Sequence, residues 1–517
     1  MNHSATHADM DACYLALKAH DARFDGHFFT GVTSTGIYCR PVCRVRTPKR
    51  ENCRFFSLAA QAERAGFRPC LRCRPELAPR QLNPGMAQDK AWSMQDASAI
   101  LTAQAAALMD APARADAPAL TVQNLAQRLG ISDRHLRRIF EAQLGVSPLQ
   151  YLQTRRLLNA KQLLTDTTLA VTRVAELSGF ASVRRFNAAF VSHYGLNPTQ
   201  LRHTRPAQRT PAAQEGIFVR LSYRPPYDVA ALLQFLAMRQ ITGLELLDQT
   251  NASLGKTMAL AHGQQRVTGW VLARFDAAHC RVNLQVSEAL AEVLPQVITR
   301  VRSLLDLDAD PLAINKVLHP DFPHGDGLRL PGTLDGFELA VRAVLGQQIT
   351  VAAARTLARR LVAQFGEPIV TPIAGLNRLF PAPQVLAAAS ADALSALGIV
   401  KQRQAAIQAL AAAVANDRLC LDSVADVQTT LAQLQALPGI GDWTAHYIAM
   451  RALHWPDVFP AADVALHKAL GLQGAAHPAK AALAASQAWQ PWRSYAVIRA
   501  WATLATPPDN GQHAKTP

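Results

Sequence analysis

The sequence predicts a multidomain, mainly α-helical protein with two smaller parts that contain β-strands. Its 517 residues exceed the length of one ordinary domain. Apolar residues recur at three- and four-residue steps over residues 118–205 and again over 326–505, which is the period of a helix. Three short runs indicate strands, one at residues 217–223 in which apolar and polar residues alternate, and two more at residues 268–275 and 281–286.

Positive charge is concentrated in the first two-fifths of the chain. Residues 1–205 contain 27 Lys and Arg against 15 Asp and Glu, whereas residues 206–517 contain 26 against 23. This imbalance favours a polyanionic partner for the first part, although a generally basic, solvated surface would also give it. No signal peptide and no apolar run of about 18 residues occur, so we expect a cytoplasmic protein without a membrane span.

Six of the eight cysteines fall before position 74, and four of these six form two short-spaced pairs. Cys39 and Cys43 form the first pair and Cys70 and Cys73 the second, with 26 residues between the pairs. This spacing is typical of tetrahedral Zn²⁺ in a reducing compartment. Four thiolates on Zn²⁺ leave a net negative charge, so the sulfurs stay nucleophilic. A purely structural zinc site and a reactive one both fit the spacing. Six arginines flank the thiols and are expected to reach DNA phosphates: Arg40, Arg44, Arg46, Arg68, Arg72 and Arg74.

The sequence segments around these cysteines resemble the N-terminal domain of Ada-type methyl sensors. The resemblance covers residues 10–78, and Phe28-Phe29, Ser34 to Cys43 and Ala65 to Pro75 carry it. It implies that residues 1–80 form a small α+β domain that holds Zn²⁺ through the four cysteines. It also implies that Cys39 accepts a methyl group from a methylphosphotriester in DNA. Methylation would remove one negative charge and weaken the repulsion of the phosphate backbone.

Residues 81–117 are rich in Ala and Pro, and we expect a linker there with one short helix over 99–109. Residues 118–205 then contain two copies of a helix-turn-helix pattern. Gly130 breaks the first copy, Ser132 is its expected N-cap, and Gly179 repeats Gly130 at a spacing of 49 residues. Between the copies, residues 149–164 contain neither Gly nor Pro and predict one helix. Two heads on a rigid helix could enter successive major grooves.

This duplicated pattern resembles the AraC-type regulators over residues 118–203. Gly179-Phe180, Phe186, Phe190 and Gly195 to Pro198 carry the resemblance. It implies binding to double-stranded DNA at promoter sites, with RNA polymerase as a further partner. The side chains expected to reach base edges or phosphates are Arg134, His135, Arg138, Arg184, Arg185 and Asn187. For any single one of these side chains, a phosphate contact or plain solvation is favoured over a contact with a base edge.

Residues 206–216 predict a second linker, and residues 217–325 predict a small α/β platform. The platform shows no set of metal ligands and no nucleophile. Its segment Leu221 to Asp228 resembles the start of AlkA-type DNA glycosylases, whose first domain is such a platform. The Pro-Cys-His-Arg motif of alkylguanine methyltransferases is absent from the chain.

Residues 326–505 contain the motif Leu437-Pro438-Gly439-Ile440-Gly441 between two amphipathic helical segments. Two glycines one residue apart permit a tight turn whose backbone N–H groups can approach an anion. The hairpin, Trp443-Thr444-Ala445, Asp463, Pro491 to Ala496 and Trp501 resemble the AlkA-type glycosylases, over about residues 221–503. The resemblance implies an all-α helix-hairpin-helix glycosylase domain whose Gly439 and Gly441 hold a DNA phosphate, commonly through a monovalent cation.

The chemistry of this site can be argued from its residue types. A base alkylated on a ring nitrogen is positively charged and is already a good leaving group. The protein must therefore flip it out, hold it, and stabilise the cationic sugar that remains. By resemblance, Asp463 supplies the stabilising carboxylate, and Trp443, Tyr447 and Trp501 form the aromatic cleft. The alternatives are an N-cap function for Asp463 and ordinary core packing for the aromatic residues.

Two positions depart from relatives in this superfamily. Trp443 stands where strand-cutting members have a Schiff-base lysine, so we expect base removal without lyase activity. Gln348 stands where better-known members have an apolar wedge that fills the gap left by the flipped base. The sequence thus predicts a fused alkylation-response protein, with residues 506–517 as a disordered tail. Two alternatives remain: a regulator with a non-catalytic glycosylase fold, and a glycosylase for oxidised or mismatched bases, which the missing lysine disfavours.

Overall fold

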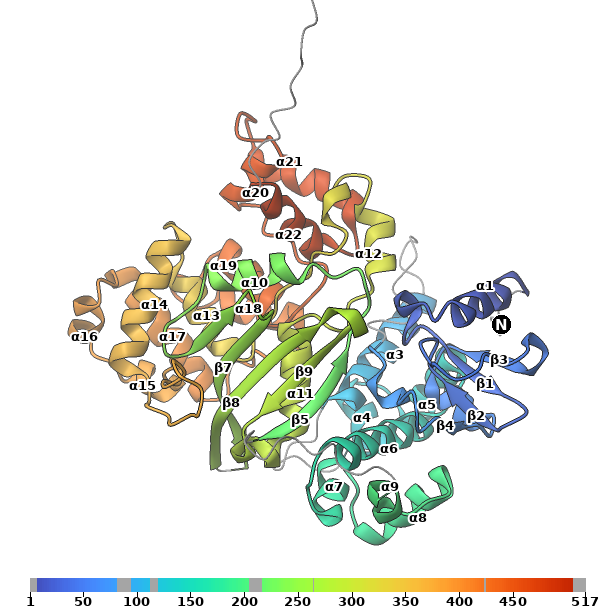
Figure 1. Ribbon diagram of the computed structural model, residues 1–517. Coiled ribbons are helices and arrows are strands. Elements are labelled where there is room, and N and C mark those ends of the chain that lie inside the picture. Colours follow the sequence, from blue (N-terminus) through green and yellow to red (C-terminus); the bar gives the residue numbers. More distant parts are fainter. Residues whose placement is uncertain are drawn as a thin grey trace, which may run out of the picture.

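The computed structural model describes residues 7–80, 94–111, 120–203, 216–263, 265–422 and 425–504. A five-stranded sheet occupies the middle of the molecule, with the helices of the C-terminal third on one side and the N-terminal modules on the other (Figure 1). Most of the second predicted linker and all of the predicted disordered tail lie outside the described residues. Within those residues, no helix combines the length and apolar character needed to cross a membrane.

The N-terminal module, residues 7–80, is a small four-stranded sheet flanked by two helices. Its strands are β1 (Phe29–Val32), β2 (Ile37–Cys39), β3 (Cys53–Phe56) and β4 (Arg68–Pro69), in the order β3-β1-β2-β4, with helices α1 (His7–Lys18) and α2 (Ala59–Arg64). β2 and β4 are parallel neighbours with Tyr38 opposite Pro69. Because parallel strands end at the same edge of a sheet, Cys39 at the end of β2 lies beside Cys70, which follows β4.

The second module contains two helix-turn-helix heads joined by one long helix. Its helices are α4 (Val122–Arg128), α5 (Asp133–Leu144), α6 (Pro148–Asp166), α7 (Val171–Leu177), α8 (Val183–Tyr194) and α9 (Pro198–His203). Ser132 caps α5 by accepting a hydrogen bond from the backbone N–H of His135, as its sequence position predicts. The joining helix predicted over residues 149–164 is confirmed as α6.

The first linker differs from its prediction. Helix α3 (Met94–Asp110) has 17 residues rather than the short segment expected, and it belongs to the packed structure. Ala105, Ala106 and Met109 share an apolar cluster with Leu136 and Phe140 of the first head. Alanine-rich composition suggested a linker, but small side chains on one helical face also permit close packing against a neighbouring helix.

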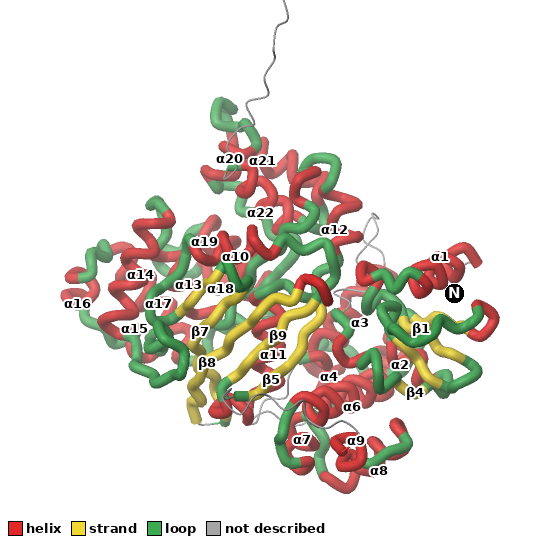
Figure 2. Tube along the Cα trace, viewed as in Figure 1, coloured by secondary structure: helices red, strands yellow, loops and turns green. Residues whose placement is uncertain are grey.

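The central sheet has the strand order β5-β9-β8-β7-β6 and is antiparallel throughout. Its strands are β5 (Ile217–Ser222), β6 (Glu245–Asp248), β7 (Ser253–His262), β8 (Gln265–Asp276) and β9 (Arg281–Val286), with helices α10 (Val229–Ala237), α11 (Leu294–Leu304) and α12 (Pro311–Leu318). Figure 2 shows these strands between helical regions. The strands predicted from the sequence are confirmed as β5, β8 and β9.

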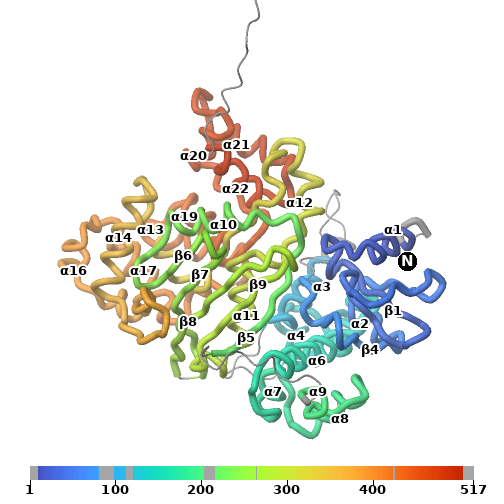
Figure 3. The backbone as a smooth tube through the Cα atoms, viewed as in Figure 1, coloured from blue at the N-terminus to red at the C-terminus, as the bar shows by residue number. Residues whose placement is uncertain are grey.

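The C-terminal third is all-α, as its apolar period predicts. It contains α13 (Gly336–Leu345), α14 (Val351–Phe365), α15 (Pro383–Ala387), α16 (Ala391–Ala396), α17 (Lys401–Ala415), α18 (Val427–Gln435), α19 (Asp442–Arg451), α20 (Val464–Ala469), α21 (Pro478–Ala485) and α22 (Arg493–Thr503). Two apolar clusters form its core, one around α13, α17 and α19 and the other around α19 and α22. Following the tube in Figure 3, the last described helices return toward α12, so α22 lies near the platform.

Candidate active site and zinc centre

The glycine hairpin lies between α18 and α19. Gly439 has φ of +75°, and a Cβ there would lie 3.0 Å from the Cβ of Ala406, so both the turn and its packing require glycine. Gly441 has φ of −89°, and a Cβ there would meet nothing within 4 Å. Packing within the chain therefore gives no reason for Gly441. It is exposed at the start of α19, which has no side-chain cap, so backbone N–H groups there are open to an anion.

The Asp463 carboxylate is held by three hydrogen-bond donors. Oδ1 accepts from the backbone N–H of Leu466, at 2.6 Å, and from the indole Nε1 of Trp501, at 3.1 Å. Oδ2 accepts from Nε1 of Trp443, at 2.7 Å. The residue is 7% exposed. The N-cap interpretation of Asp463 is thus correct, and it coexists with a carboxylate fixed between two indoles on α19 and α22.

The three predicted aromatic residues lie together beside this carboxylate. The rings of Trp443 and Tyr447 are stacked, with centroids 5.3 Å apart and an interplanar angle of 17°. Trp501 lies 6.3 Å from Tyr447 at 39°. All three are half-buried and keep ring surface open, and Tyr447 and Trp501 also pack against the apolar core. They form one wall whose indole N–H groups point at Asp463.

A group of arginines that sequence reasoning missed surrounds the Tyr447 hydroxyl. Arg451 Nη1 donates to Tyr447 Oη at 2.9 Å, and the guanidinium groups of Arg451 and Arg239 lie over the ring of Phe235, 4.8 and 3.7 Å from its centroid. Burial raises the pKa of Tyr447, but the charges of Arg451, Arg239 and Arg342 outweigh it and lower this pKa. The sequence signal that could have identified Arg451 is its position four residues after Tyr447, because residues four apart are neighbours on a helix.

The wedge position lies in a turn that is bound to the hairpin. Gln347 Nε2 donates to the Gly439 carbonyl and to Thr444 Oγ1, both at 2.9 Å, and Arg403 donates to the Gln347 carbonyl. The next residue, Gln348, is exposed and has φ of +55°, a conformation that costs energy for a residue with a side chain. The turn and the hairpin are therefore a single unit that presents Gln348 and half-exposed Ile349 outward.

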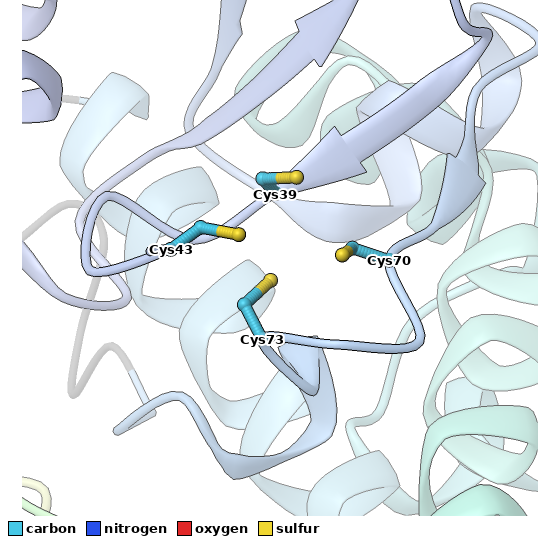
Figure 4. Close-up of side chains that lie close together, drawn as sticks. All are labelled: Cys39, Cys43, Cys70 and Cys73. Carbon is cyan, nitrogen blue, oxygen red and sulfur yellow. The ribbon is translucent and has the colours of Figure 1, made fainter. Parts of the chain in front are cut away.

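The four predicted cysteines converge, as Figure 4 shows. Their sulfur atoms all lie within 4.8 Å of one another. A tetrahedral Zn²⁺ with Zn–S distances of about 2.3 Å needs sulfurs roughly 3.8 Å apart, so the set fits the ion after small adjustments. Hydrogen bonds among the four sulfurs lower the pKa of Cys70 and raise the pKa of Cys39, as expected for thiols this close together. Cys53 is not among these ligands.

Two of the six arginines expected to contact DNA have a different function. Arg40 is buried and pairs with Asp25. Arg74 is buried between Glu76 and Asp166. Neither side chain can reach a DNA phosphate in this conformation. Their position beside thiolates suggested phosphate contacts, but the sequence could not show the carboxylates that enclose them.

The residues predicted to contact DNA from the regulator lie on the second helix of each head. Arg134, Arg138, Arg184, Arg185 and Asn187 are exposed on α5 and α8. His135 is half-buried, and its Nδ1 lies 3.0 Å from Nη2 of Arg138. The recognition faces of both heads are thus polar and open.

Four family models match four successive parts of the chain. The metal-binding domain of Ada matches residues 12–76, and a helix-turn-helix domain matches 125–204. The AlkA N-terminal domain matches residues 218–335, and the HhH-GPD superfamily of base excision DNA repair proteins matches 341–494.

Relatives cover the whole chain or its parts. A probable bifunctional transcriptional activator/DNA repair enzyme AlkA of Mycobacterium tuberculosis is 36% identical over 97% of this chain and 98% of its own length. DNA-3-methyladenine glycosylase 2 of Escherichia coli is 36% identical over 56% of this chain and 98% of its own length. The regulatory protein ada of Salmonella typhimurium is 37% identical over 28% of this chain and 36% of its own length.

A cysteine set that fits Zn²⁺, a double helix-turn-helix module and a hairpin glycosylase domain thus occur in one chain, which is similar to the full-length relative over almost all of its length. The chain therefore belongs to the family of bifunctional transcriptional activator/DNA repair proteins that join an Ada-type zinc domain to an AlkA-type DNA glycosylase.

Proposed function

We propose that this DNA glycosylase hydrolyses the N-glycosidic bond of bases alkylated on ring nitrogens, with 3-methyladenine as the reference substrate, and that Asp463 is its catalytic carboxylate. The observation that supports this most directly is the Asp463 carboxylate, fixed by two indole N–H groups beside a stacked aromatic wall. The proposal includes Gly439 and Gly441 as the phosphate-binding turn, with a monovalent cation between the hairpin and the phosphate.

The arrangement suggests a simple mechanism. A flipped cationic base would stack on Trp443 and Tyr447, and each cation–π contact contributes about 0.5–2 kcal/mol. As the bond between sugar and base breaks, the electron pair leaves with the base and positive charge develops on the sugar. The Asp463 carboxylate stabilises this charge and can orient the water that completes hydrolysis. The indole N–H groups keep the carboxylate in place throughout.

The structure gives no reason to expect strand cleavage after base removal. A lyase needs a primary amine to form a Schiff base, and Trp443 occupies the position of that amine in lyase-active relatives. We therefore assign a monofunctional glycosylase. The retained carboxylate, cleft and hairpin argue against the alternative of a regulator with a non-catalytic glycosylase fold.

A direct test measures release of 3-methyladenine from alkylated duplex DNA. The wild type should release the base and Asp463→Asn should not, while both bind a duplex with an abasic-site analogue. Cys39→Ala serves as the control, because it leaves the glycosylase site untouched and should release the base at the wild-type rate. Equal release by wild type and Asp463→Asn, or none by either, would refute the catalytic assignment.

We extend the proposal to the N-terminal cysteines. When bound, Zn²⁺ would hold the sulfurs of Cys39, Cys43, Cys70 and Cys73 as thiolates. The Cys39 sulfur then attacks the methyl carbon of a methylphosphotriester. A C–S bond forms while the C–O bond breaks, and the electron pair leaves with the phosphate oxygen, restoring a diester anion. Transfer of labelled methyl to the wild type but not to Cys39→Ala would support this step, and equal uptake by the two proteins would exclude it.

The regulator module completes the proposed function. Arg134, His135 and Arg138 of the first head and Arg184, Arg185 and Asn187 of the second would read promoter sites, and recruitment of RNA polymerase would follow. Methylation of Cys39 makes the sensor less negative and would raise its affinity for the same DNA.

A further inference from the structure

Arg224, which follows β5 in the glycosylase platform, joins the N-terminal module to the glycosylase. The Arg224 side chain carries a charge, yet it is only 1% exposed. Its three guanidinium nitrogens donate to five backbone carbonyl oxygens, at 2.8–3.1 Å, those of Asp25, Pro79, Arg80, Asp308 and Ala309. The first three belong to the N-terminal module and the last two to the platform. One guanidinium therefore satisfies carbonyl groups from both halves of the chain.

A second buried arginine links the same contact to the cysteines. The Arg40 side chain pairs with the Asp25 carboxylate and donates to Ser222 Oγ on β5, at 3.2 Å. Its backbone N–H points at Cys73 Sγ, 3.4 Å away, and its Nη1 donates to the Cys73 carbonyl at 3.1 Å. Arg40 also directly follows Cys39. A shift of the cysteine loops therefore moves a residue that touches both Asp25 and the platform.

The segment Asp306 to Asp310 receives these contacts on the platform side. Asp308 Oδ1 accepts from the backbone N–H of Arg80 at 2.6 Å, and Asp310 Oδ1 lies 3.4 Å from His27 Nε2. Asp306 faces the opposite way and accepts from Tyr495 Oη at 3.1 Å, on the helix α22 that carries Trp501. The segment thus lies between the N-terminal module and a helix of the glycosylase site.

The N-terminal module and the regulator contact the platform through different chemistry. The regulator and the platform share an apolar cluster that includes Leu164 and Val174 on one side and Leu221 and Val286 on the other. The N-terminal module meets the platform through guanidinium groups, carboxylates and carbonyl oxygens. Polar contacts of this kind depend on geometry and separate more readily than apolar ones, because water can replace each partner.

We propose that the N-terminal module docks on the glycosylase through a polar contact, the docking seam, which opens when the four-cysteine cluster loses its order. The docking seam consists of Asp25, Arg40, Ser222, Arg224 and Asp308. The zinc module is then an intramolecular partner of the glycosylase, released when its cysteine loops change. The inference rests on the zinc site of the proposed function but on neither methyl transfer nor base release, so its failure would leave both of those activities standing.

Hydrogen exchange on the full-length, zinc-loaded protein tests the seam. In Arg224→Ala, the five carbonyl groups lose their donor, and peptides covering residues 305–310 should exchange about tenfold faster or more. The matched control is Arg266→Ala, which removes an exposed arginine of the same sheet, paired with Glu367, and should leave these peptides unchanged. Equal protection of residues 305–310 in Arg224→Ala and the wild type would overturn the docking assignment.

The coupling to the cysteines is tested by removing zinc from the wild type with a chelator, with the metal content measured. Faster exchange of residues 305–310 is expected, reversed when zinc is restored, and Arg224→Ala should show no further increase. Unchanged exchange in the stripped protein would overturn the coupling. Peptides from β1 report whether the module's sheet stays folded. If the β1 peptides lose protection in the stripped protein, the zinc-loaded variant Arg40→Met provides the test. In this variant, residues 305–310 should exchange faster while the β1 peptides stay protected. Wild-type exchange of residues 305–310 in this variant would overturn the coupling.

Discussion

At the scale of single residues, the Asp463 carboxylate combines an observed helix cap with a proposed catalytic function. It caps α20 and it faces the aromatic wall, and both functions require the side chain to stay in one orientation. Caps are usually replaceable by Ser, Thr or Asn, whereas stabilisation of a cationic sugar requires a charge. The two functions therefore separate in Asp463→Asn, which keeps the cap and loses the charge.

The indole of Trp443 gives a prediction at this scale. Trp443→Phe keeps a stacking ring but removes the N–H that holds Asp463 Oδ2. A hydrogen bond to a charged group contributes about 1.5–3 kcal/mol, so kcat for base release should fall by about tenfold or more while abasic-site affinity changes little. Trp492→Phe is the matched control, since Trp492 packs edge-on against Tyr495. A rate for Trp443→Phe equal to that of the control would mean that the N–H does not position the carboxylate.

At the scale of elements, the wedge turn before α14 and the hairpin before α19 act as one unit through Gln347. Gln347→Leu removes both side-chain hydrogen bonds, leaves Gly439 O and Thr444 Oγ1 without that donor, and loosens the turn that presents Gln348, which then keeps the bond from Arg403 to the backbone carbonyl of residue 347. We expect affinity for a duplex with an abasic-site analogue to fall by about tenfold, as for the loss of one to two hydrogen bonds. Gln348→Leu keeps the anchored turn and should bind within about threefold of wild type. Similar affinities for both variants would show that the anchor is dispensable.

The junction of β6, β7 and α13 gives a pH-dependent prediction. Glu245 is buried, which raises its pKa, but Arg342 and Lys256 outweigh burial and lower the pKa from 4.5 to about 2. Because the folded-state pKa lies below the unfolded one, Glu245 stabilises the fold above about pH 4.5, and this contribution is lost as the pH falls toward 2. A shift of this size corresponds to roughly 3 kcal/mol.

Glu245→Gln should therefore be less stable at pH 7 and should lose less stability than the wild type between pH 4.5 and 3. Urea unfolding at several pH values measures both effects. Glu367→Gln, at an exposed pair, should follow the wild-type profile. Parallel profiles for Glu245→Gln and the wild type would contradict the assigned pKa.

The sequence predicted elements well where one physical signal dominated. Alternation identified β5, and the helical period identified the paired heads. Strand β7 was missed because Lys256, Met258 and Ala259 favour helices, and pairing with β8 along its whole length overrides that preference. The length of helix α3 was underestimated because an alanine-rich composition indicates a helix but does not show which neighbouring helix it packs against.

At the scale of the whole molecule, the candidate site was predictable and the contacts between modules were not. The cysteine pairs, the hairpin glycines and Asp463 belong to short sequence motifs, whose chemistry follows from residue type and spacing. Arg224, Arg40 and Lys161 have partners that lie tens to hundreds of positions away, and the place of Arg40 beside the thiols suggested a DNA contact rather than burial. Burial of a charge is decided by the tertiary structure, so no local pattern marks these residues in advance.

Lys161 fastens the N-terminal module to the regulator. It is buried on α6, and its Nζ donates to the Cys70 carbonyl at 3.0 Å and to Glu76 Oε2 at 2.8 Å. Burial raises the pKa of Glu76, but Lys161 and Arg74 outweigh it and lower this pKa, so the carboxylate depends on both cations. Lys161→Met keeps the volume but leaves Glu76 with one partner. Breaking a buried pair costs about 3–5 kcal/mol, so the first transition in urea should move to clearly lower concentration. Lys49→Met, at an exposed pair with Glu51, should leave it in place. If both variants unfold at the wild-type midpoint, the buried lysine does not hold the two modules together.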